Sequence, residues 1–367
     1  MRRTVEILVA IIGAALVLVV TGANQSWLDH HFLPSFFIPR RWYVLIETAV
    51  RIAIAAGGAS LVVGRSRLAR LLTRDPMMSL SVVAAAVCAM GSGELVLRWI
   101  HLPPTGWLVR EEEPRRQDDP RLGWVLAPSR TGRAFVSGRT LEYATDGSGY
   151  RVRRAGEPVD VERPTLIFAG ESVMFGEGLA WDETIPAQVS AMLGLQSANV
   201  AVHGYSTDQI YMRLAHELPR FRQPAAVISI FMTELFGRNL DSDRPHLGPG
   251  LVWQPAERKP RLMALASLLV PYRRESTVER GIRITHDALV AMTELAHRRG
   301  AMALVVVPQF GDEDESQRTL RERILTAEIP VALVHLDPDW RLAWDRHPNA
   351  GAALVVATAI ASRLHAR

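Results

Sequence analysis

The sequence predicts an α/β domain with a parallel sheet, preceded by three membrane-spanning helices. Three observations support this prediction. Long apolar runs are concentrated before residue 104, short apolar runs alternate with amphipathic segments after residue 163, and a serine follows the first of these short runs. Alternating strands and helices favour a parallel sheet with helices on both faces. The 367 residues, 48% of them hydrophobic, suffice for more than one folding unit.

The membrane domain is predicted at 1–103, with transmembrane helices at about 6–22, 43–63 and 77–100. Each run is close to the roughly 20 residues that cross a hydrocarbon core. The first run would also fit a signal peptide, but the two later runs favour a spanning helix. The connector at 65–74 carries four arginines, and the positive-inside tendency places it and the N-terminus in the cytoplasm. Residues after about 103 are then expected on the far side of the membrane.

Some charged residues in this part need a separate interpretation. Arg40 and Arg41 lie in the loop that this topology places outside, which argues mildly against it. Glu47 and Arg51 lie inside the second apolar run, four residues apart. An intramembrane charge is a functional candidate, but residues at this spacing share one helix face. We therefore expect Glu47 and Arg51 to pair with each other.

Residues 104–163 are predicted to be a linker followed by a small β-rich segment. The run at 111–120 mixes acidic and basic residues, which is typical of a solvated linker. The stretch from Phe135 to Tyr150 contains the glycines and Asp-Gly pair of short hairpins.

The soluble domain is predicted at 164–367, with strands and helices in strict alternation. The expected strands are Leu166–Ala169, Ala198–Val202, Ala225–Phe231, Met302–Val307 and Val331–Leu336. The expected helices are Ile185–Leu193, Gln209–Leu218, Val278–His297, Ser316–Thr326 and Ala350–Leu364. A long irregular stretch, Asp241–Arg274, contains Trp253 and Tyr272; it either borders an acceptor site or forms a surface flap.

Three loops at the carboxyl ends of these strands carry candidate chemistry, because open α/β sheets place ligands there. Ser172 follows the first strand, where a serine is either a helix cap or a nucleophile. Gly204 follows the second strand and is either a turn glycine or a donor of its N–H to an oxyanion. Asp345 and His347 precede the last helix and could supply an orienting carboxylate and a base.

Composition argues against two other classes of site. The net charge is +4 and the isoelectric point is near 9.6, but the arginines are dispersed without a basic block, so we expect no nucleic-acid binding. Cys88 is the single cysteine and lies in an apolar run. We therefore expect no disulfide within the chain, no thiolate metal site and no cysteine nucleophile in the soluble part.

From about residue 120 onward, the chain resembles the SGNH hydrolases, in particular their bacterial membrane-anchored branch. The soluble domain of that branch opens with Leu-Gly-Trp-x-Leu-x-Pro, here Leu122–Pro128. Gly170-Glu171-Ser172 is similar to the first family block, Gly-Asp-Ser, with glutamate in place of aspartate. The resemblance implies a flavodoxin-like three-layer α/β/α fold. It also implies Ser172 as nucleophile, His347 as base and Asp345 as its orienting partner, with Ser172 and Gly204 as oxyanion donors.

Two departures from the family pattern affect this assignment. The third block usually places an oxyanion asparagine after the third strand, where this chain has Thr233. Either Thr233 substitutes, Asn239 folds back, or the enzyme is slow or altered, since one lost donor costs about a hundredfold to a thousandfold in rate. The family's last block is commonly Asp-x-x-His, whereas Asp345 precedes His347 by two residues and Trp344 occupies the usual aspartate position.

The resemblance implies a serine esterase of the inner membrane whose soluble domain faces the periplasm or exterior and acts on O-acyl groups of a surface glycan or on another ester. No metal or organic cofactor is expected. The expected partners are the lipid bilayer and proteins of surface-polysaccharide assembly. An O-acyltransferase using the same serine and histidine is an alternative. A non-catalytic glycan-binding or assembly component that kept the fold is another, supported by Thr233 and the short Asp-His spacing.

Overall fold

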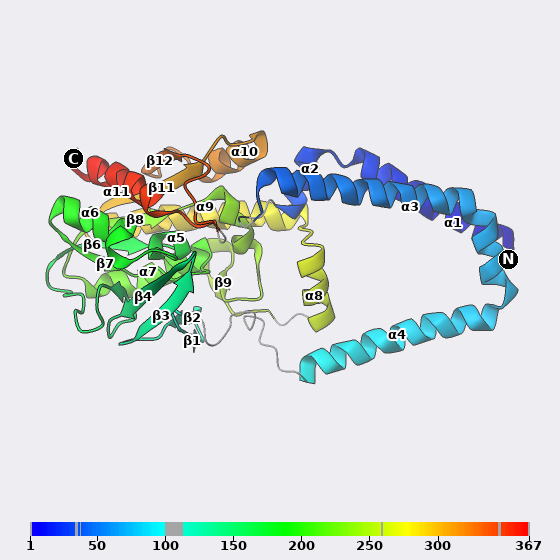
Figure 1. Cartoon of the computed structure of the whole chain (residues 1–367), viewed down its shortest axis with the longest axis horizontal. Helices are drawn as coiled ribbons and strands as arrows, with labels where there is room; N and C mark the ends of the chain where they lie inside the picture. Colours follow the sequence, from blue (N-terminus) through cyan, green and yellow to red (C-terminus); the bar gives the residue numbers. More distant parts are fainter. Residues whose placement is uncertain are drawn as a thin grey trace. The chain divides into compact units, whose positions relative to one another are not determined.

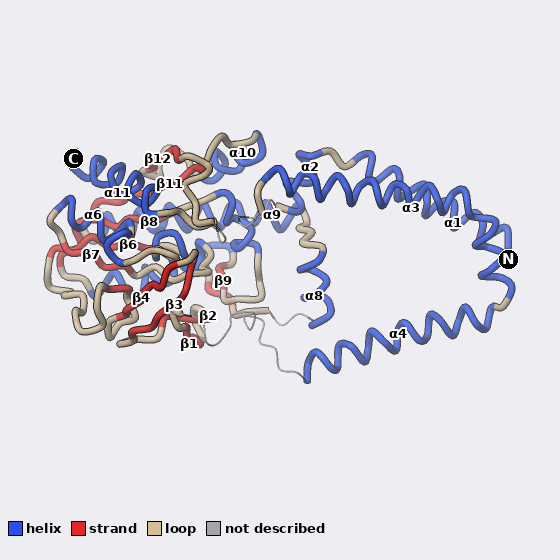
Figure 2. The backbone as a smooth tube through the Cα atoms, viewed as in Figure 1, coloured by secondary structure: helices blue, strands red, loops and turns tan. Residues whose placement is uncertain are grey.

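A computed structural model describes residues 2–33, 36, 38–99, 113–257, 260–343 and 346–365 (Figure 1). The chain divides into two compact units. One comprises 1–102 and 259–274, and the other comprises 103–258 and 275–367. Figure 2 shows that the described part of the first unit is helical, whereas the second combines helices with strands.

The first unit contains three helices that are long and apolar enough to cross a membrane: Arg2–Gly22, Arg40–Arg74 and Met77–Trp99. Its helices are α1 (Arg2–Gly22), α2 (Gln25–Phe32), α3 (Arg40–Arg74), α4 (Pro76–Trp99) and α8 (Arg261–Leu269). The arginine-rich connector at 65–74 continues α3 as helix. Most side chains along the three spans are exposed, as expected of helices that contact lipid.

Helices α1 and α3 pack with their backbones in close contact at two glycines. A Cβ atom on Gly13 would lie 2.6 Å from the carbonyl oxygen of Gly58, and one on Gly58 would lie 2.7 Å from that of Gly13. Small residues permit such close approach between membrane helices.

The expected Glu47–Arg51 pair does not form. Glu47 Oε2 accepts a hydrogen bond of 2.6 Å from Gln25 Nε2, while Arg51 Nη2 donates to the carbonyl oxygen of Val20 at 3.3 Å. Glu47 therefore bonds to the start of α2, and Arg51 bonds to the last turn of α1. The sequence spacing could not anticipate this choice, because it depends on packing between helices.

The segment 259–274 groups with the helical unit, although we predicted all of 164–367 as one domain. Glu94 on α4 accepts hydrogen bonds from the backbone N–H groups of Arg261 (2.9 Å) and Leu262 (2.8 Å). These contacts satisfy two of the unpaired amides at the start of α8. Tyr272 stacks on His31 with ring centroids 5.3 Å apart. Trp253, the other aromatic residue named in the stretch Asp241–Arg274, is in the second unit and donates from Nε1 to the carbonyl oxygen of Arg121 at 3.0 Å.

The second unit is built on an eight-stranded sheet in the order β12-β11-β8-β6-β7-β5-β4-β3. Its strands are β3 (Thr131–Val136), β4 (Arg139–Thr145), β5 (Arg151–Val152), β6 (Pro164–Ala169), β7 (Gln196–Asn199), β8 (Gln223–Ile230), β11 (Met302–Phe310) and β12 (Val331–Leu336). The five strands from β12 to β7 are parallel, and β5, β4 and β3 extend the sheet in antiparallel pairing. Among the parallel strands, this is the flavodoxin-like order 2-1-3-4-5.

Helices cover both faces of the sheet. The α-helices are α5 (Ser172–Phe175), α6 (Ile185–Leu193), α7 (Thr207–Glu217), α9 (Glu275–Arg298), α10 (Glu315–Ile324) and α11 (Ala350–His365). The 3₁₀ helices are η1 (Trp181–Glu183), η2 (Leu218–Arg220), η3 (Thr233–Leu240) and η4 (Pro249–Leu251). Right-handed crossovers put α6 and α11 on one face and α7, α9 and α10 on the other. The packing of α6 on α11 and of α9 on α7 and α10 agrees with this (Figure 1).

The predicted fold class is confirmed, and every strand and helix predicted in 164–367 lies close to its expected position. Two expectations upstream change. Part of the predicted linker, Arg116–Asp119, is strand β1, which pairs with β2 (Gly123–Leu126). The predicted small β-rich segment joins the main sheet, because Arg151 of β5 pairs with Asn199 of β7. A second two-stranded sheet joins β9 (His246–Leu247) to β10 (Trp253–Gln254).

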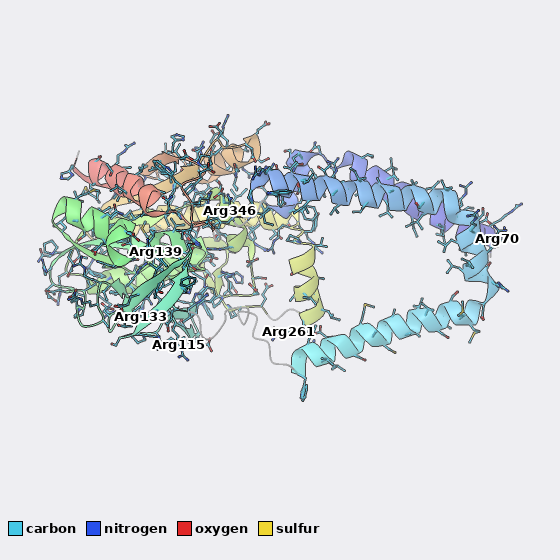
Figure 3. All side chains as sticks on the ribbon, viewed as in Figure 1. Arg70, Arg115, Arg133, Arg139, Arg261 and Arg346 are labelled. Atoms are coloured by element: carbon cyan, nitrogen blue, oxygen red, sulfur yellow. The ribbon has the colours of Figure 1, made fainter. Side chains whose placement is uncertain are left out.

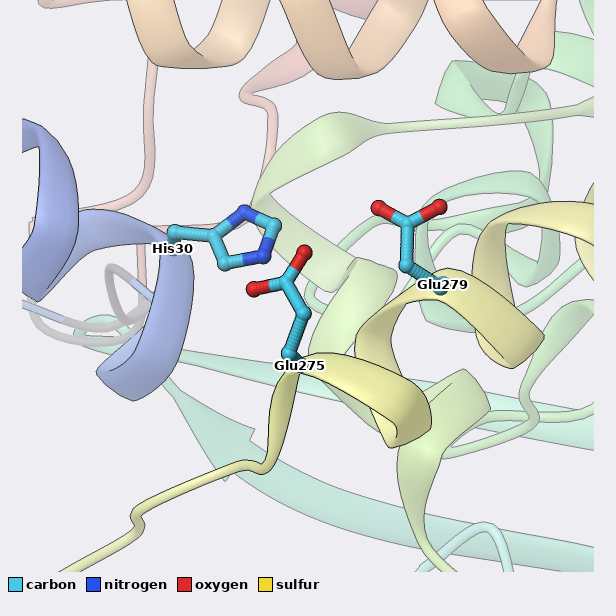
Figure 4. Close-up of side chains that lie close together, drawn as sticks. All are labelled: His30, Glu275 and Glu279. Atoms are coloured by element: carbon cyan, nitrogen blue, oxygen red, sulfur yellow. The ribbon is translucent and has the colours of Figure 1, made fainter.

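Ion pairs tie outer helices together in this unit. Figure 4 shows Glu275 and Glu279 one turn apart at the start of α9. Arg323 of α10 donates to both carboxylate oxygens of Glu279, at 2.8 and 2.6 Å. Arginines labelled in Figure 3 lie on separate elements, and two of them, Arg133 and Arg139, pair with glutamates.

Gly58→Ala is expected to destabilise the helical unit, because its methyl group would overlap the Gly13 carbonyl. Gly57→Ala is the matched control, since a Cβ atom there meets nothing within 4 Å. The thermal unfolding midpoint of the full chain in detergent should fall for Gly58→Ala and be retained or raised for Gly57→Ala, as alanine favours helix. Equal midpoints for the two variants would contradict the close α1–α3 contact.

Candidate active site

Ser172 is the first residue of α5, immediately after the carboxyl end of β6. Gly170 permits the sharp turn, because a Cβ atom there would lie 2.4 Å from the Cβ of Met174 and 2.7 Å from Cγ2 of Ile230. Glu171 is the N-cap, and its Oε2 accepts a hydrogen bond of 3.0 Å from the N–H of Val173. The strand, the glycine and the cap together fix the position of the Ser172 side chain.

His347 lies beside this serine. Its Nε2 is 2.8 Å from Ser172 Oγ, although the two residues are 175 positions apart in the sequence. Ser172 is 2% exposed and His347 4%. Glu177 Oε2 is 3.7 Å from the same histidine nitrogen. The structure therefore brings a hydroxyl and an imidazole into hydrogen-bonding distance in a site largely closed to water.

The loop that carries His347 is held by several backbone bonds. Arg341 and Pro348 form an isolated β-bridge, and the N–H of Leu342 donates to the carbonyl oxygen of His347 at 2.6 Å. Asn349 Oδ1 accepts from the N–H of Ala352 at 3.0 Å and so caps α11. These contacts hold the loop at both ends.

A salt bridge connects the histidine loop to the loop after β8. Arg341 Nη2 donates to both carboxylate oxygens of Glu234, at 3.0 Å each. The Arg341 side chain is 5% exposed and lies over the ring of Phe310, 3.9 Å from its centroid. Glu234 follows Thr233, so this pair ties the predicted third oxyanion loop to the predicted base.

Gly204 lies on a loop adjacent to the serine turn, because the N–H of Val202 donates to the carbonyl oxygen of Gly170 at 3.1 Å. Its φ of +81° favours glycine, and a Cβ atom would lie 3.2 Å from Cζ2 of Trp124. Trp124 Nε1 donates to the carbonyl oxygen of His203 at 3.1 Å. Since this carbonyl and the Gly204 N–H share one peptide plane, Trp124 fixes the direction of that N–H.

The loop and the start of α7 are also bonded to the Leu122–Pro128 segment and to Arg244, which follows η3. Tyr205 donates its hydroxyl to the carbonyl oxygen of Trp124 at 2.6 Å. Gln209 Nε2 donates to the carbonyl oxygen of Leu122 at 2.6 Å. Beyond η3, Arg244 Nη1 donates to the carbonyl oxygen of Gly204 at 2.8 Å. The Leu122–Pro128 segment thus supports the loop that carries Gly204.

Arg151 is a supporting residue that the sequence does not single out. It is buried and donates to the carbonyl oxygens of Phe175 (2.7 Å), Gly176 (2.6 Å) and Leu179 (2.6 Å). Its guanidinium lies 4.8 Å from the ring centroid of Tyr143 and 4.7 Å from that of Phe175. Burial lowers the pKa of Arg151 to about 10, so it stays charged at neutral pH. The sequence could not indicate this role, because Arg151 is one of many arginines and lies in a short strand.

The remaining predicted residues have different outcomes. Thr233 is the half-buried first residue of η3, and its role as an oxyanion donor stays a prediction. The amide of Asn239 is engaged elsewhere: Oδ1 accepts from the N–H of Thr207, and Nδ2 donates to the hydroxyls of Thr207 and Thr285. Asn239 is therefore a link between η3, α7 and α9. Trp344 and Asp345 lie outside the described residues, so the orienting role of Asp345 also stays a prediction.

Charged and titratable side chains surround the serine turn. Arg238 Nη1 is 3.8 Å from Glu171 Oε2. Burial lowers the pKa of His203 well below its usual value, and the nearby Arg116 adds to this effect. His203 is therefore neutral at physiological pH. Neither of its ring nitrogens has a hydrogen-bond partner among the described residues.

Comparisons with known proteins were made by sequence and by structure. No family model matches the chain, and no curated protein matches it. The fold is similar to several solved structures. A G-D-S-L family protein from Desulfitobacterium hafniense is 14% identical, with 55% of this chain and 98% of that chain covered and a TM-score of 0.34. A GDSL-like lipase from Bacteroides thetaiotaomicron is 14% identical, with 57% and 91% covered and a TM-score of 0.34. An acetyl xylan esterase from Butyrivibrio proteoclasticus is 12% identical, with 57% and 66% covered and a TM-score of 0.35.

Arg151→Met is expected to destabilise the second unit by about 3 kcal/mol or more, because three buried carbonyl groups lose their donor. Arg153→Met is the control, since Arg153 is on the surface and pairs with the exposed Asp182. Chemical denaturation followed by tryptophan fluorescence would measure both. A loss below about 1 kcal/mol for Arg151→Met would contradict its anchoring role.

Proposed function

We propose that the protein is a membrane-anchored serine esterase in which Ser172 is the nucleophile and His347 the general base. The observation that carries this proposal is the 2.8 Å distance between Ser172 Oγ and His347 Nε2. A serine hydroxyl is a weak nucleophile unless a neighbouring base takes its proton. A helix cap alone would not need a buried imidazole at the hydroxyl, and Glu171 already provides the cap of α5.

The proposed reaction has two halves. Ser172 Oγ attacks the ester carbonyl carbon as its proton passes to His347 Nε2, and the carbonyl oxygen becomes an oxyanion. The tetrahedral intermediate expels the alcohol, which takes the proton from His347, and leaves an acyl-serine. Water then attacks the acyl group with His347 again as base, and the intermediate collapses to release the acid and free Ser172. Asp345 is proposed to orient His347.

The proposed oxyanion site uses the N–H groups of Ser172 and Gly204, with the Thr233 hydroxyl as a third donor. Support for Gly204 comes from its fixed peptide plane, because Trp124 binds the preceding carbonyl oxygen. Preorganised donors of this kind stabilise charge without reorganising during the reaction. Since Asn239 is engaged by two threonines, Thr233 is the better candidate for the third donor.

The proposed substrate is an O-acyl group on a surface glycan, hydrolysed outside the cytoplasm of a bacterial cell. Three helices long and apolar enough to cross a membrane support anchoring. The arginines at the N-terminus and at 65–74 support a cytoplasmic N-terminus. An odd number of spans then delivers the soluble unit to the periplasm, where such glycans are modified.

A fluorophosphonate probe tests the nucleophile, because it reacts with an activated serine and leaves a capping serine unmodified. The full-length protein in detergent should be labelled, Ser172→Ala should not, and His347→Ala should be labelled at least about a hundredfold more slowly. Ser190→Ala is the control, since the Ser190 hydroxyl donates to the carbonyl oxygen of Leu195, away from the site. Equal labelling of the wild type and Ser172→Ala would refute the proposed nucleophile.

The proposed topology has its own test. Alkaline phosphatase fused after residue 110 should be active in a bacterial host, because the enzyme matures only outside the cytoplasm. A fusion after residue 70, in the arginine-rich end of α3, should be inactive. The reverse pattern would overturn the orientation and leave the proposed chemistry unaffected.

A further inference from the structure

The glutamate preceding the candidate nucleophile touches its reacting atom. Glu171 Oε2 lies 2.6 Å from Ser172 Oγ, in addition to its cap bond with Val173. Ser172 Oγ therefore has two neighbours at hydrogen-bonding distance, the carboxylate of Glu171 and the imidazole of His347. The described mechanism uses only the imidazole.

Ser172 Oγ can donate its proton to only one of these two neighbours. A serine hydroxyl has one proton to donate, and an ionised carboxylate can only accept. If Ser172 donates to Glu171, then His347 Nε2 must carry a proton and donate to Oγ. If Ser172 donates to His347, then Glu171 must be protonated, or two lone pairs would face each other at 2.6 Å. The bond to an ionised acceptor is the stronger one, so the first arrangement is favoured.

We propose that Glu171 is a catalytic residue that holds the Ser172 proton away from His347 in the resting enzyme. In that state His347 Nε2 is a donor and cannot act as base. Catalysis then requires the hydroxyl to turn from Glu171 to an unprotonated His347 Nε2. This inference rests on the proposed serine mechanism and adds to it a built-in restraint on the nucleophile.

The surroundings of Glu171 fit a carboxylate directed at the serine. Oε1 has no hydrogen-bond partner among the described residues. Glu171 borders a cavity of about 20 Å³, enough for roughly one water molecule. The nearest cation is Arg238, whose Nη1 is 3.8 Å from Oε2. Within the described chain, the hydrogen bonds of the Glu171 side chain are thus made by one oxygen, to Ser172 and Val173.

The length of the side chain matters. The Gly-Asp-Ser block that Gly170-Glu171-Ser172 resembles has aspartate at this position, and its side chain is one methylene shorter than that of glutamate. Aspartate is a strong N-cap and would keep the bond to Val173 and the negative charge, but it would withdraw from Ser172 Oγ. Glu171→Asp therefore separates the contact with the nucleophile from the cap of α5.

Glu171→Gln separates the charge from the contact. A glutamine whose amide nitrogen takes the place of Oε2 donates to Ser172 Oγ, which turns the serine proton toward His347, and it gives up the cap bond with Val173. It also removes a negative charge that stabilises a protonated imidazole. Other charged or titratable groups facing this region are Glu177, Arg238 and His203.

The test measures the rate constant of fluorophosphonate inactivation from pH 5 to pH 9, with the full-length protein in detergent. We expect the maximal rate to rise about tenfold or more in Glu171→Asp, because a charge-assisted bond no longer holds the hydroxyl. In Glu171→Gln, we expect a similar rise in the maximal rate. The acidic limb of its pH–rate profile should also move to lower pH. Thermal unfolding shows whether each variant is folded, and either variant alone tests the inference.

Glu177→Gln is the matched control. Its carboxylate is 3.7 Å from His347 Nε2 and is not among the groups bonded to Ser172 Oγ. Glu177→Gln should move the acidic limb of the pH–rate profile to lower pH without raising the maximal rate. Combining Ser172→Ala with Glu171→Asp should abolish labelling, which assigns the faster reaction to Ser172.

The outcomes separate this inference from the proposed function. If the wild type is labelled and folded Glu171→Asp has an unchanged or lower maximal rate, Glu171 is only a cap, and the inference fails while the esterase proposal stands. If no protein is labelled at Ser172, the serine mechanism fails and the inference fails with it. Faster labelling in the Glu171 variants, lost on adding Ser172→Ala, supports both.

Discussion

The hydrogen bond between Ser172 Oγ and His347 Nε2 is the contact on which the interpretation of this protein depends. It joins the end of the first parallel strand to the loop before the last helix. Parallel strands collect their outgoing loops at one edge of the sheet, so residues far apart in the chain meet there. The sheet order places β6 in the middle of this edge, with the loops of β7 and β8 on either side.

Much of the second unit serves to hold these loops. Arg151 binds three carbonyl groups behind α5, and Trp124 fixes the peptide before Gly204. The Arg341–Glu234 pair connects the loop of β8 to that of His347. Buried polar groups of this kind are costly unless they are paired. Their bonds to backbone carbonyls and to a carboxylate explain how a closed site can contain so many of them.

Glu171 gives the site a feature beyond a serine and a base. Its carboxylate caps α5 and contacts the nucleophile with the same oxygen. A single hydroxyl proton cannot serve both neighbours of Ser172 Oγ. The role of Glu171 therefore depends on which of these two neighbours receives the proton.

The sequence by itself determined the fold class, the three apolar helices, and the five parallel strands and five longer helices of the second unit, because hydrophobic periodicity is a local property. It also identified Ser172, Gly204 and His347 as residues at the ends of strands. It did not predict α8 or the pair β9–β10, which lie in the stretch 241–274 that we expected to be irregular. The tertiary structure decided which groups meet. It showed that Asn239 links helices, that β3–β5 extend the main sheet, that 259–274 groups with the long apolar helices, and that Glu171 reaches Ser172 Oγ. These outcomes depend on contacts between distant segments and on side-chain direction, which spacing along the chain does not encode.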